Sequence, residues 1–321
     1  MVEATGLVTV AIPTRDRPRS LLKAVASVVL QSYGRLEIIV SDNNSSGDTR
    51  KSVAGVADPR IKYFRHDSDL TMTENWNFCL QRASGEYFLL LSDDDSLAAG
   101  AITELLKGLT DEGAVLSYGR AVFRDDAGGF LGVSRAAPRL EPGEAFIQAS
   151  LSGLRNALPS ATLFRTALAR ELGGYPEIGN STDLALRLAL ATHGTVACVP
   201  APILEYSIHP GGLSLDTAKT RESFLKLAEW AGRPSAPLAK WRGLVARYCA
   251  GSLRSRARRS ALRGDLAGAR VLLEASNLIA PGSRLADFAV EAFSWAPVRS
   301  FAGLLRAIRQ YLRSVLFGRR V

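Results

Sequence analysis

Four short apolar segments in the first 91 residues, separated by helical patterns, limit the folds open to this chain. Residues 7–12 (LVTVAI) are rich in β-branched side chains and are stopped by Pro13, as expected of a strand buried on both faces. Comparable segments occupy residues 36–40, 61–64 and 87–91. Because strands that alternate with helices build parallel sheets, the pattern predicts an α/β fold on a mostly parallel sheet.

Helical patterns fill the spaces between these strands. Ser20 is expected to cap a helix that runs to about Ser32, since serine is a favoured N-cap residue. Further helices are expected over about residues 74–82 and 97–109. The later segment 125–129 (DDAGG) has the composition of a hairpin turn or loop.

Two regions of the chain differ in charge. Its 321 residues are enough for about two domains. Residues 1–214 hold 20 basic and 24 acidic side chains, whereas residues 215–321 hold 20 basic and 7 acidic ones. From about Thr217 the sequence is typical of helices only. We therefore expect an α/β domain over residues 1–215 and a basic helical region over residues 216–321.

The basic region favours a phosphate-bearing partner. No RRM, zinc-finger or helix-turn-helix signature accompanies the charge, so nucleic acid is not an expected partner. Residues 299–316 repeat apolar side chains at helical spacing, with arginines mostly off that stripe. Such a helix either lies on an anionic membrane surface or packs on its own domain, and the sequence leaves both open.

Cysteine usage and the absence of targeting patterns bear on the compartment. Cys79, Cys198 and Cys249 lie far apart, which excludes a disulfide framework and a CxxC metal site. The N-terminal residues lack a signal-peptide pattern. The longest uncharged stretch, residues 188–204, is shorter than the roughly 20 apolar residues of a spanning helix. We expect a cytoplasmic protein, and peripheral attachment to the inner face of the cell membrane through the basic C-terminal helix is left open as one alternative.

Polar residues at the strand ends are the candidate functional groups. The first, second and fourth strands run into residues 13–17 (PTRDR), 41–45 (SDNNS) and 92–95 (SDDD). Ligands of open parallel sheets collect at this edge. Three consecutive carboxylates repel one another, and a divalent cation with oxygen ligands offsets that repulsion. The sequence thus predicts a Mn²⁺ or Mg²⁺ site, with the alternative that Asp95 or Ser96 only caps the next helix.

The order of these motifs resembles family 2 glycosyltransferases of the nucleotide-diphospho-sugar transferase (GT-A) fold. The resemblance covers residues 6–214, two thirds of the chain. The matching segments are 10–17 (VAIPTRDR), 31–33 (QSY), 37–42 (EIIVSD), 83–87 (ASGEY), 92–95 (SDDD), 163–165 (LFR), 172–175 (LGGY), 183–189 (DLALRLA) and 206–209 (YSIH). The resemblance implies a GT-A catalytic domain over residues 1–215, with the helical region as a C-terminal appendage.

The resemblance also implies roles for individual residues. The implied nucleotide-binding residues are Pro13, Thr14, Arg15, Asp42, Asp93 and Asp94, and the implied metal ligands are Asp95 and His209. Which of the carboxylates at positions 93–95 coordinates the ion stays open. Asp183 matches the general base, which accepts a proton from the acceptor hydroxyl. By residue type alone, Asp183 is equally typical of a first helical turn, and His209 of a surface turn.

The activity implied is an inverting transfer of one sugar from a nucleotide-diphosphate donor, with a UDP-sugar as first choice. The acceptor would be a hydroxyl of a glycan or lipid-linked molecule in surface polysaccharide biosynthesis. The Gln-x-x-Arg-Trp motif of processive members is absent, which favours one sugar per encounter. Two alternative functions remain open. One is a sugar-phosphate nucleotidyltransferase, whose Gly-rich phosphate loop residues 13–17 lack, and the other is an inactive GT-A-like scaffold bound to membrane through its basic tail.

Overall fold

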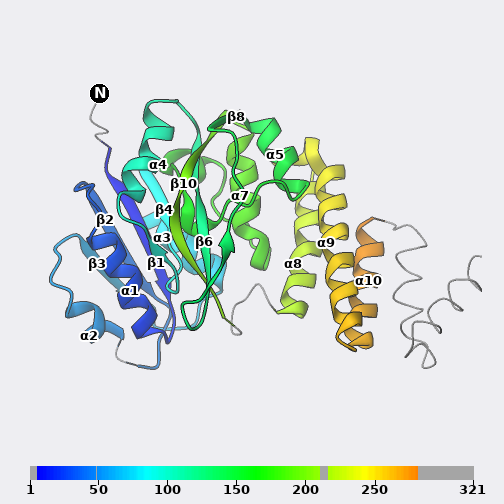
Figure 1. The fold of residues 1–321 in the computed structure, drawn as a ribbon, viewed down its shortest axis with the longest axis horizontal. Coiled ribbons are helices and arrows are strands. Elements are labelled where there is room, and N and C mark those ends of the chain that lie inside the picture. The colour runs from blue at the N-terminus through cyan, green and yellow to red at the C-terminus, as the bar shows by residue number, and fades with distance from the viewer. Residues whose placement is uncertain (1–5, 48, 210–215, 281–321) are drawn as a thin grey trace, which may run out of the picture.

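The computed structural model describes residues 6–47, 49–209 and 216–280, which form a central sheet with helices on both faces and three helices at one side (Figure 1). The strands are β1 (Val8–Thr14), β2 (Leu36–Asp42), β3 (Ile61–Arg65), β4 (Tyr87–Leu90), β5 (Ser96–Leu97), β6 (Leu116–Asp125), β7 (Phe130–Val133), β8 (Leu140–Pro142), β9 (Thr162–Arg165) and β10 (Thr195–Ile208). The helices are α1 (Pro18–Val29), α2 (Thr49–Ala54), α3 (Met72–Arg82), α4 (Ala101–Thr110), α5 (Gly143–Leu151), α6 (Thr166–Glu171), α7 (Thr182–Ala191), α8 (Thr217–Gly232), α9 (Arg242–Leu262) and α10 (Leu266–Ile279), with 3₁₀ turns η1 (Pro159–Ala161), η2 (Gly179–Ser181) and η4 (Ala239–Trp241).

The sheet has the strand order β3-β2-β1-β4-β9-β6-β10-β5, and β7 and β8 are added on β6 and β10. Strands β3, β2, β1 and β4 are parallel neighbours. Strand β9 enters antiparallel between β4 and β6. The predicted class, a mostly parallel α/β sheet of the GT-A type with helices at its C-terminal side, is confirmed.

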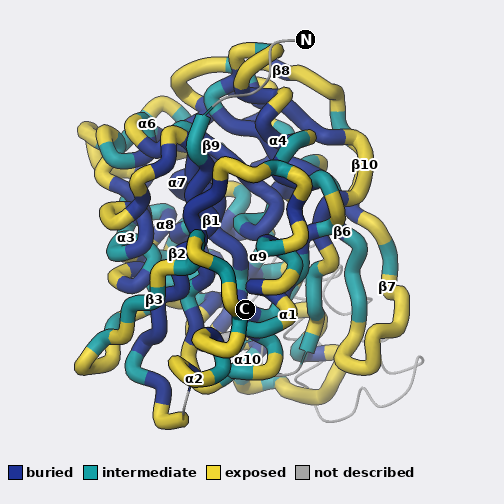
Figure 2. Tube along the Cα trace, turned by 90° about the vertical axis from the view of Figure 1, so that its left-hand side faces the viewer, coloured by how far each residue is buried: buried dark blue, intermediate teal, exposed yellow. Residues whose placement is uncertain are grey.

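Side chains of the central strands alternate between two hydrophobic clusters, one on each face of the sheet. Val8, Val10 and Ile12 of β1 pack in the cluster of α1 and α4, whereas Ala11 belongs to the cluster that includes α3 and α7. Figure 2 shows β1 and β2 buried almost along their whole length. A strand covered on both faces needs apolar side chains throughout, which explains the uninterrupted run at residues 7–12.

Two helices in this half begin where the sequence analysis did not expect them. Helix α1 begins at Pro18, ahead of the predicted cap Ser20. Proline suits the first helical turn because a backbone N–H at that position has no partner within the helix, so its absence costs no hydrogen bond. Helix α4 begins at Ala101, after Gly100 with φ 75°. Neither Asp95 nor Ser96 caps this helix, so the capping alternative for the acidic segment is wrong.

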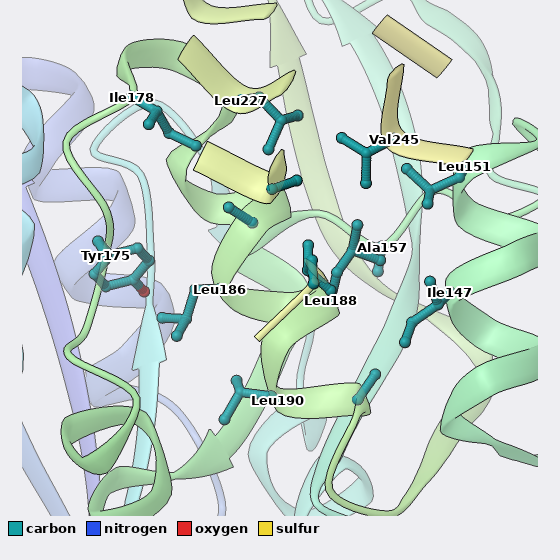
Figure 3. Close-up of a cluster of buried hydrophobic side chains, with 14 of the residues drawn as sticks. Ile147, Leu151, Ala157, Tyr175, Ile178, Leu186, Leu188, Leu190, Leu227 and Val245 are labelled. Atoms are coloured by element: carbon teal, nitrogen blue, oxygen red, sulfur yellow. The ribbon is translucent and has the colours of Figure 1, made fainter. Parts of the chain in front are cut away.

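Helices α8, α9 and α10 confirm the predicted helical character of residues 216–280 and pack beside α5 and α7 (Figure 1). Leu227 of α8 and Val245 of α9 share one buried cluster with Leu186 and Leu188 of α7 (Figure 3). The cluster therefore anchors α7 against the C-terminal helices. The helix predicted over residues 299–316 lies outside the described residues. Within the described ranges, no helix has the length and apolar character to span a membrane.

Leu188→Ala is expected to lower the free energy of unfolding by about 2–5 kcal/mol, because the change leaves a cavity at a fully buried position. Denaturant unfolding measures the difference. Leu262→Ala, at a leucine that is 73% exposed at the end of α9, is the control and should change it by less than about 0.5 kcal/mol. A loss at Leu188 no larger than the control's would contradict the packing described for α7.

Candidate functional site

The ends of β1, β4 and β10 border a cavity of about 1030 Å³, whose other walls include α3, α5 and the loop after it, the start of α7, and helices α8 and α9. Seven predicted site residues line it: Pro13, Thr14, Arg15, Asp93, Asp94, Asp183 and His209. Asp42 and Asp95 do not line it, and each is only 1% exposed. The fold therefore brings the predicted donor-side residues and the predicted base to one cavity.

Charged groups from three segments meet at Asp94. His209 Nε2 lies 2.8 Å from Asp94 Oδ2, and Arg17 Nη1 donates to the same oxygen at 3.0 Å. Arg17 also donates to Asp93 Oδ1 at 3.2 Å, while Thr14 Oγ1 donates to Asp93 Oδ2 at 2.7 Å. Burial raises the pKa of Asp93, and the hydrogen bond from Thr14 acts against it. Arg17 thus offsets part of the repulsion between the neighbouring carboxylates.

Asp95 is held by two later segments of the chain. Its Oδ2 accepts from Ser160 Oγ at 2.6 Å, and its Oδ1 accepts from the Ser207 backbone N–H at 3.1 Å. Burial raises the pKa of Asp95 to about 7. These contacts tie the loop after β4 to η1 and β10. The role of Asp95 as a metal ligand stays a prediction.

The carboxylate of Asp42, like that of Asp95, is held by hydrogen bonds from neighbouring residues. Its Oδ1 accepts from the Ser45 backbone N–H at 2.9 Å, and its Oδ2 accepts from the Tyr63 hydroxyl. Burial and this hydrogen bond raise the pKa of Tyr63. The next residue, Asn43, lines the cavity. The nucleotide-binding role of Asp42 therefore also stays a prediction.

Asp183 is the second residue of α7 and lines the cavity with an 18% exposed side chain. Its Oδ2 accepts from Arg187 Nη1, one turn further along the helix, at 2.7 Å. Among the residues that the structure describes, its Oδ1 accepts no hydrogen bond. Asp183 lies in the first turn of a helix, as the sequence predicted. The carboxylate nevertheless pairs with Arg187 and caps no described backbone N–H, so it keeps one free oxygen.

Several cavity residues were missed by the sequence analysis. Arg17 was present in the motif at residues 13–17 but received no role, although a cation beside an acidic strand end was a usable signal. Others come from α3 and from the loop after α5, and a further group comes from the C-terminal helices, where no motif marks them: Lys219, Thr220, Phe224, Tyr248 and Arg256. Helix packing alone brings these residues to the cavity.

The residues at the acidic edge fit a divalent cation that is shared with a ligand. Across the described ranges, no group of three or more His, Cys, Asp or Glu side chains gathers to hold a metal alone. Mg²⁺ is usually bound by one or two carboxylates, with water and substrate phosphates as its other ligands. Asp94 Oδ2, on a side chain 23% exposed, is an oxygen ligand of the kind that Mn²⁺ and Mg²⁺ prefer. His209 Nε2, on a side chain 22% exposed, is a nitrogen ligand that suits a first-row transition metal such as Mn²⁺ better than Mg²⁺.

The fold is the GT-A fold, as the match to two solved structures shows. TarS 1–349 of S. aureus, in complex with UDP, matches with a TM-score of 0.65 at 15% identity, over 98% of this chain and 92% of TarS 1–349. The mannosyltransferase PcManGT of Pyrobaculum calidifontis, in complex with GDP-Man and Mn²⁺, matches with a TM-score of 0.57 at 17% identity, over 96% of this chain and 88% of that one. At these identities the likeness shows the fold alone.

The chain belongs to glycosyl transferase family 2, whose model matches residues 9–173, just over half of the sequence. It is 38% identical over 121 residues to the GalNAc(5)-diNAcBac-PP-undecaprenol beta-1,3-glucosyltransferase of Campylobacter jejuni. That alignment covers 37% of this chain and 39% of the relative's length. The family resemblance found in the sequence is therefore confirmed.

Proposed function

We propose that the chain is an inverting, non-processive glycosyltransferase that transfers one sugar from a UDP-sugar to a hydroxyl of a glycan or lipid-linked acceptor in surface polysaccharide biosynthesis. The observation that carries the proposal is one cavity lined by Asp94, His209 and Asp183. The UDP bound to TarS supports the choice of donor, and the undecaprenol-linked substrate in the name of the Campylobacter relative supports the acceptor class.

In this proposal, the donor's diphosphate lies at the acidic edge of the cavity. When bound, Mn²⁺ or Mg²⁺ supplies positive charge that neutralises the departing diphosphate. Asp94 and His209 would hold the ion, in place of the predicted pair Asp95 and His209, because Asp94 contacts His209 and lines the cavity whereas Asp95 does not line it. Pro13, Thr14 and Arg15 contact the nucleotide. Asp42 and Asp93, also predicted on the nucleotide side, support this contact: Asp93 fixes Thr14, and Asp42 fixes the turn before Ser45.

Asp183 acts as the general base in the transfer step. Its free Oδ1 accepts the proton of the acceptor hydroxyl, while Arg187 holds Oδ2 and so orients the carboxylate. The acceptor oxygen forms a bond to the anomeric carbon as the bond from that carbon to the diphosphate oxygen breaks. The electron pair of the broken bond leaves with UDP. Attack from the side opposite the leaving group inverts the anomeric configuration.

The same proposal divides the chain and places it in the cell. Residues 1–215 form the catalytic domain, and residues 216–321 form the basic region that attaches to the anionic inner face of the cell membrane. A lipid-linked acceptor supports this location, because such a substrate stays in the membrane. The excess of basic over acidic side chains after Ser214 supports the attachment.

UDP with Mn²⁺ is expected to raise the Tm of the protein by several degrees, and more than ADP or GDP does. A ligand at 100 times its Kd adds about 2.7 kcal/mol to the stability of the native state. With about 2.1 cal/mol/K of unfolding entropy per residue, each kcal/mol shifts the Tm of a 321-residue protein by about 1.5 °C. Thermal unfolding with each nucleotide measures the shift, and UDP with EDTA is the control. A chain that no nucleoside diphosphate stabilises in Mn²⁺ would contradict the proposed function.

A further inference from the structure

The cavity wall formed by α8 and α9 carries a cation without an anionic partner. Arg256 of α9 lines the cavity, is partly buried, and makes no hydrogen bond or ion pair with any described residue. Each of the other arginines that line the cavity has a carboxylate partner, and these pairs are Arg15–Asp69, Arg17–Asp93, Arg155–Glu141 and Arg187–Asp183. Burial lowers the pKa of Arg256, and Arg259 acts in the same direction. A bound anion would offset this uncompensated charge.

A buried hydroxyl on the same wall is also unpaired. Thr220 of α8 lines the cavity and is 4% exposed, and its Oγ1 has no hydrogen-bond partner within the described part of the chain. Most buried side-chain polar atoms in proteins have a partner, so one without a partner at a cavity wall requires an explanation. The hydroxyl has a hydrogen to donate to a ligand oxygen that enters beside it.

The packing of α8 against α9 places these two groups at the same end of the helix pair. The rings of Phe224 and Tyr248 meet edge to face, with centroids 5.9 Å apart. Only the short connection through η4 joins the two helices, so they run antiparallel. Thr220 lies one turn before Phe224, and Arg256 lies two turns after Tyr248. Both residues are therefore displaced from the ring contact in the same direction.

This end of the wall is connected to Asp183 through Tyr248. Burial raises the pKa of the Tyr248 phenol, and the negative charge of Asp183 acts in the same direction. The charge of Arg256 in turn interacts with Tyr248. On α8, Ser223 lies three residues after Thr220, and its Oγ donates to Ser181 Oγ at 2.9 Å, two residues before Asp183. The unpaired groups belong to the Asp183 side of the cavity.

We propose that Arg256 and Thr220 form an anion subsite that binds a phosphate group of the acceptor. A guanidinium presents paired N–H donors that match two phosphate oxygens, and the Thr220 hydroxyl adds a further donor. The assignment of this phosphate to the acceptor rests on the proposed function, because Asp183 is the base that meets the acceptor there. The substrate class is then a lipid-linked or glycan acceptor that carries a phosphate or diphosphate.

Calorimetry with geranyl diphosphate and with inorganic phosphate, in EDTA, tests the subsite. Wild-type protein is expected to bind geranyl diphosphate, and Arg256→Gln should weaken that binding about tenfold or more, as expected for a lost charge-assisted hydrogen bond. Thr220→Val should weaken it about two- to tenfold. The matched control is Arg258→Gln, at an exposed arginine of α9 that does not line the cavity, and it should bind as wild type does.

Further measurements separate a ligand-binding role from other roles. Thr220→Val should not lower the Tm without ligand, because the removed hydroxyl has no described partner, and a fall of several degrees would overturn its assignment. UDP with Mn²⁺ should bind Arg256→Gln as tightly as wild type, and a loss there would move Arg256 to the donor site. Equal affinity of wild type and Arg256→Gln for geranyl diphosphate, or a preference for glucuronate over both phosphate anions, would also overturn the proposal. If the wild-type protein binds geranyl diphosphate but not UDP, that result would contradict the proposed function and would still support the anion subsite.

Discussion

Asp183→Asn is expected to lower kcat for sugar transfer by about 10²- to 10⁴-fold, the range typical of a lost general base. The amide keeps the size of the side chain but cannot accept the proton of the acceptor hydroxyl. UDP affinity in Mn²⁺ should stay at the wild-type value, because the residues assigned to the donor lie at the other wall. The rate of acceptor-dependent UDP release measures kcat, and calorimetry measures UDP affinity.

Asp126→Asn is the matched control, because it makes the same chemical change at an exposed carboxylate in the turn between β6 and β7. Its transfer rate should equal that of wild type. Arg187, with a side chain only 9% exposed, loses its ion pair in the Asp183 variant. The Tm is therefore measured as well, and rates are compared well below it. A folded Asp183→Asn protein with the wild-type rate would refute the assignment of the base.

The acidic edge could be predicted from the sequence because its determinants are local. Each strand is a short apolar run that ends in polar residues, and parallel pairing then brings those ends together, as the register of Thr14 with Asp42 shows. The direction in which each carboxylate points could not be predicted in the same way. Tyr63 on β3 turns Asp42, and Ser160 and Ser207, distant in sequence, turn Asp95. These contacts depend on packing between remote segments.

The residues of α8 and α9 that form the opposite wall of the cavity could not be predicted from the sequence pattern. The sequence after residue 216 predicts helices, but it does not show which face of each helix meets the sheet domain. That choice depends on the buried cluster in which Leu227 and Val245 join the leucines of α7. The antiparallel entry of β9 was missed for a related reason, since residues 162–165 carry no signal of strand direction.

Asp94→Asn is expected to lower the affinity for UDP in Mn²⁺ by about 10²-fold or more, because metal-mediated charge stabilisation is worth several kcal/mol and each 1.4 kcal/mol is a factor of ten. EDTA should lower the affinity of wild type to the same level, and it should change little in the variant. Asp94 is the carboxylate of the acidic segment that contacts His209, and it lines the cavity. Calorimetry with and without EDTA measures all four affinities.

Asp95→Asn decides which carboxylate of the acidic segment holds the ion. The amide oxygen can still accept from the Ser207 N–H, and the amide nitrogen can still donate to Ser160 Oγ, so the contacts that orient Asp95 survive the change. With Asp94 as the ligand, Asp95→Asn keeps UDP affinity within about fivefold of wild type, since it changes a buried hydrogen bond by less than about 1 kcal/mol. A 10²-fold loss in Asp95→Asn beside an unaffected Asp94→Asn would instead make Asp95 the ligand. That result would require its carboxylate to leave Ser160 and Ser207 and turn into the cavity when the donor binds.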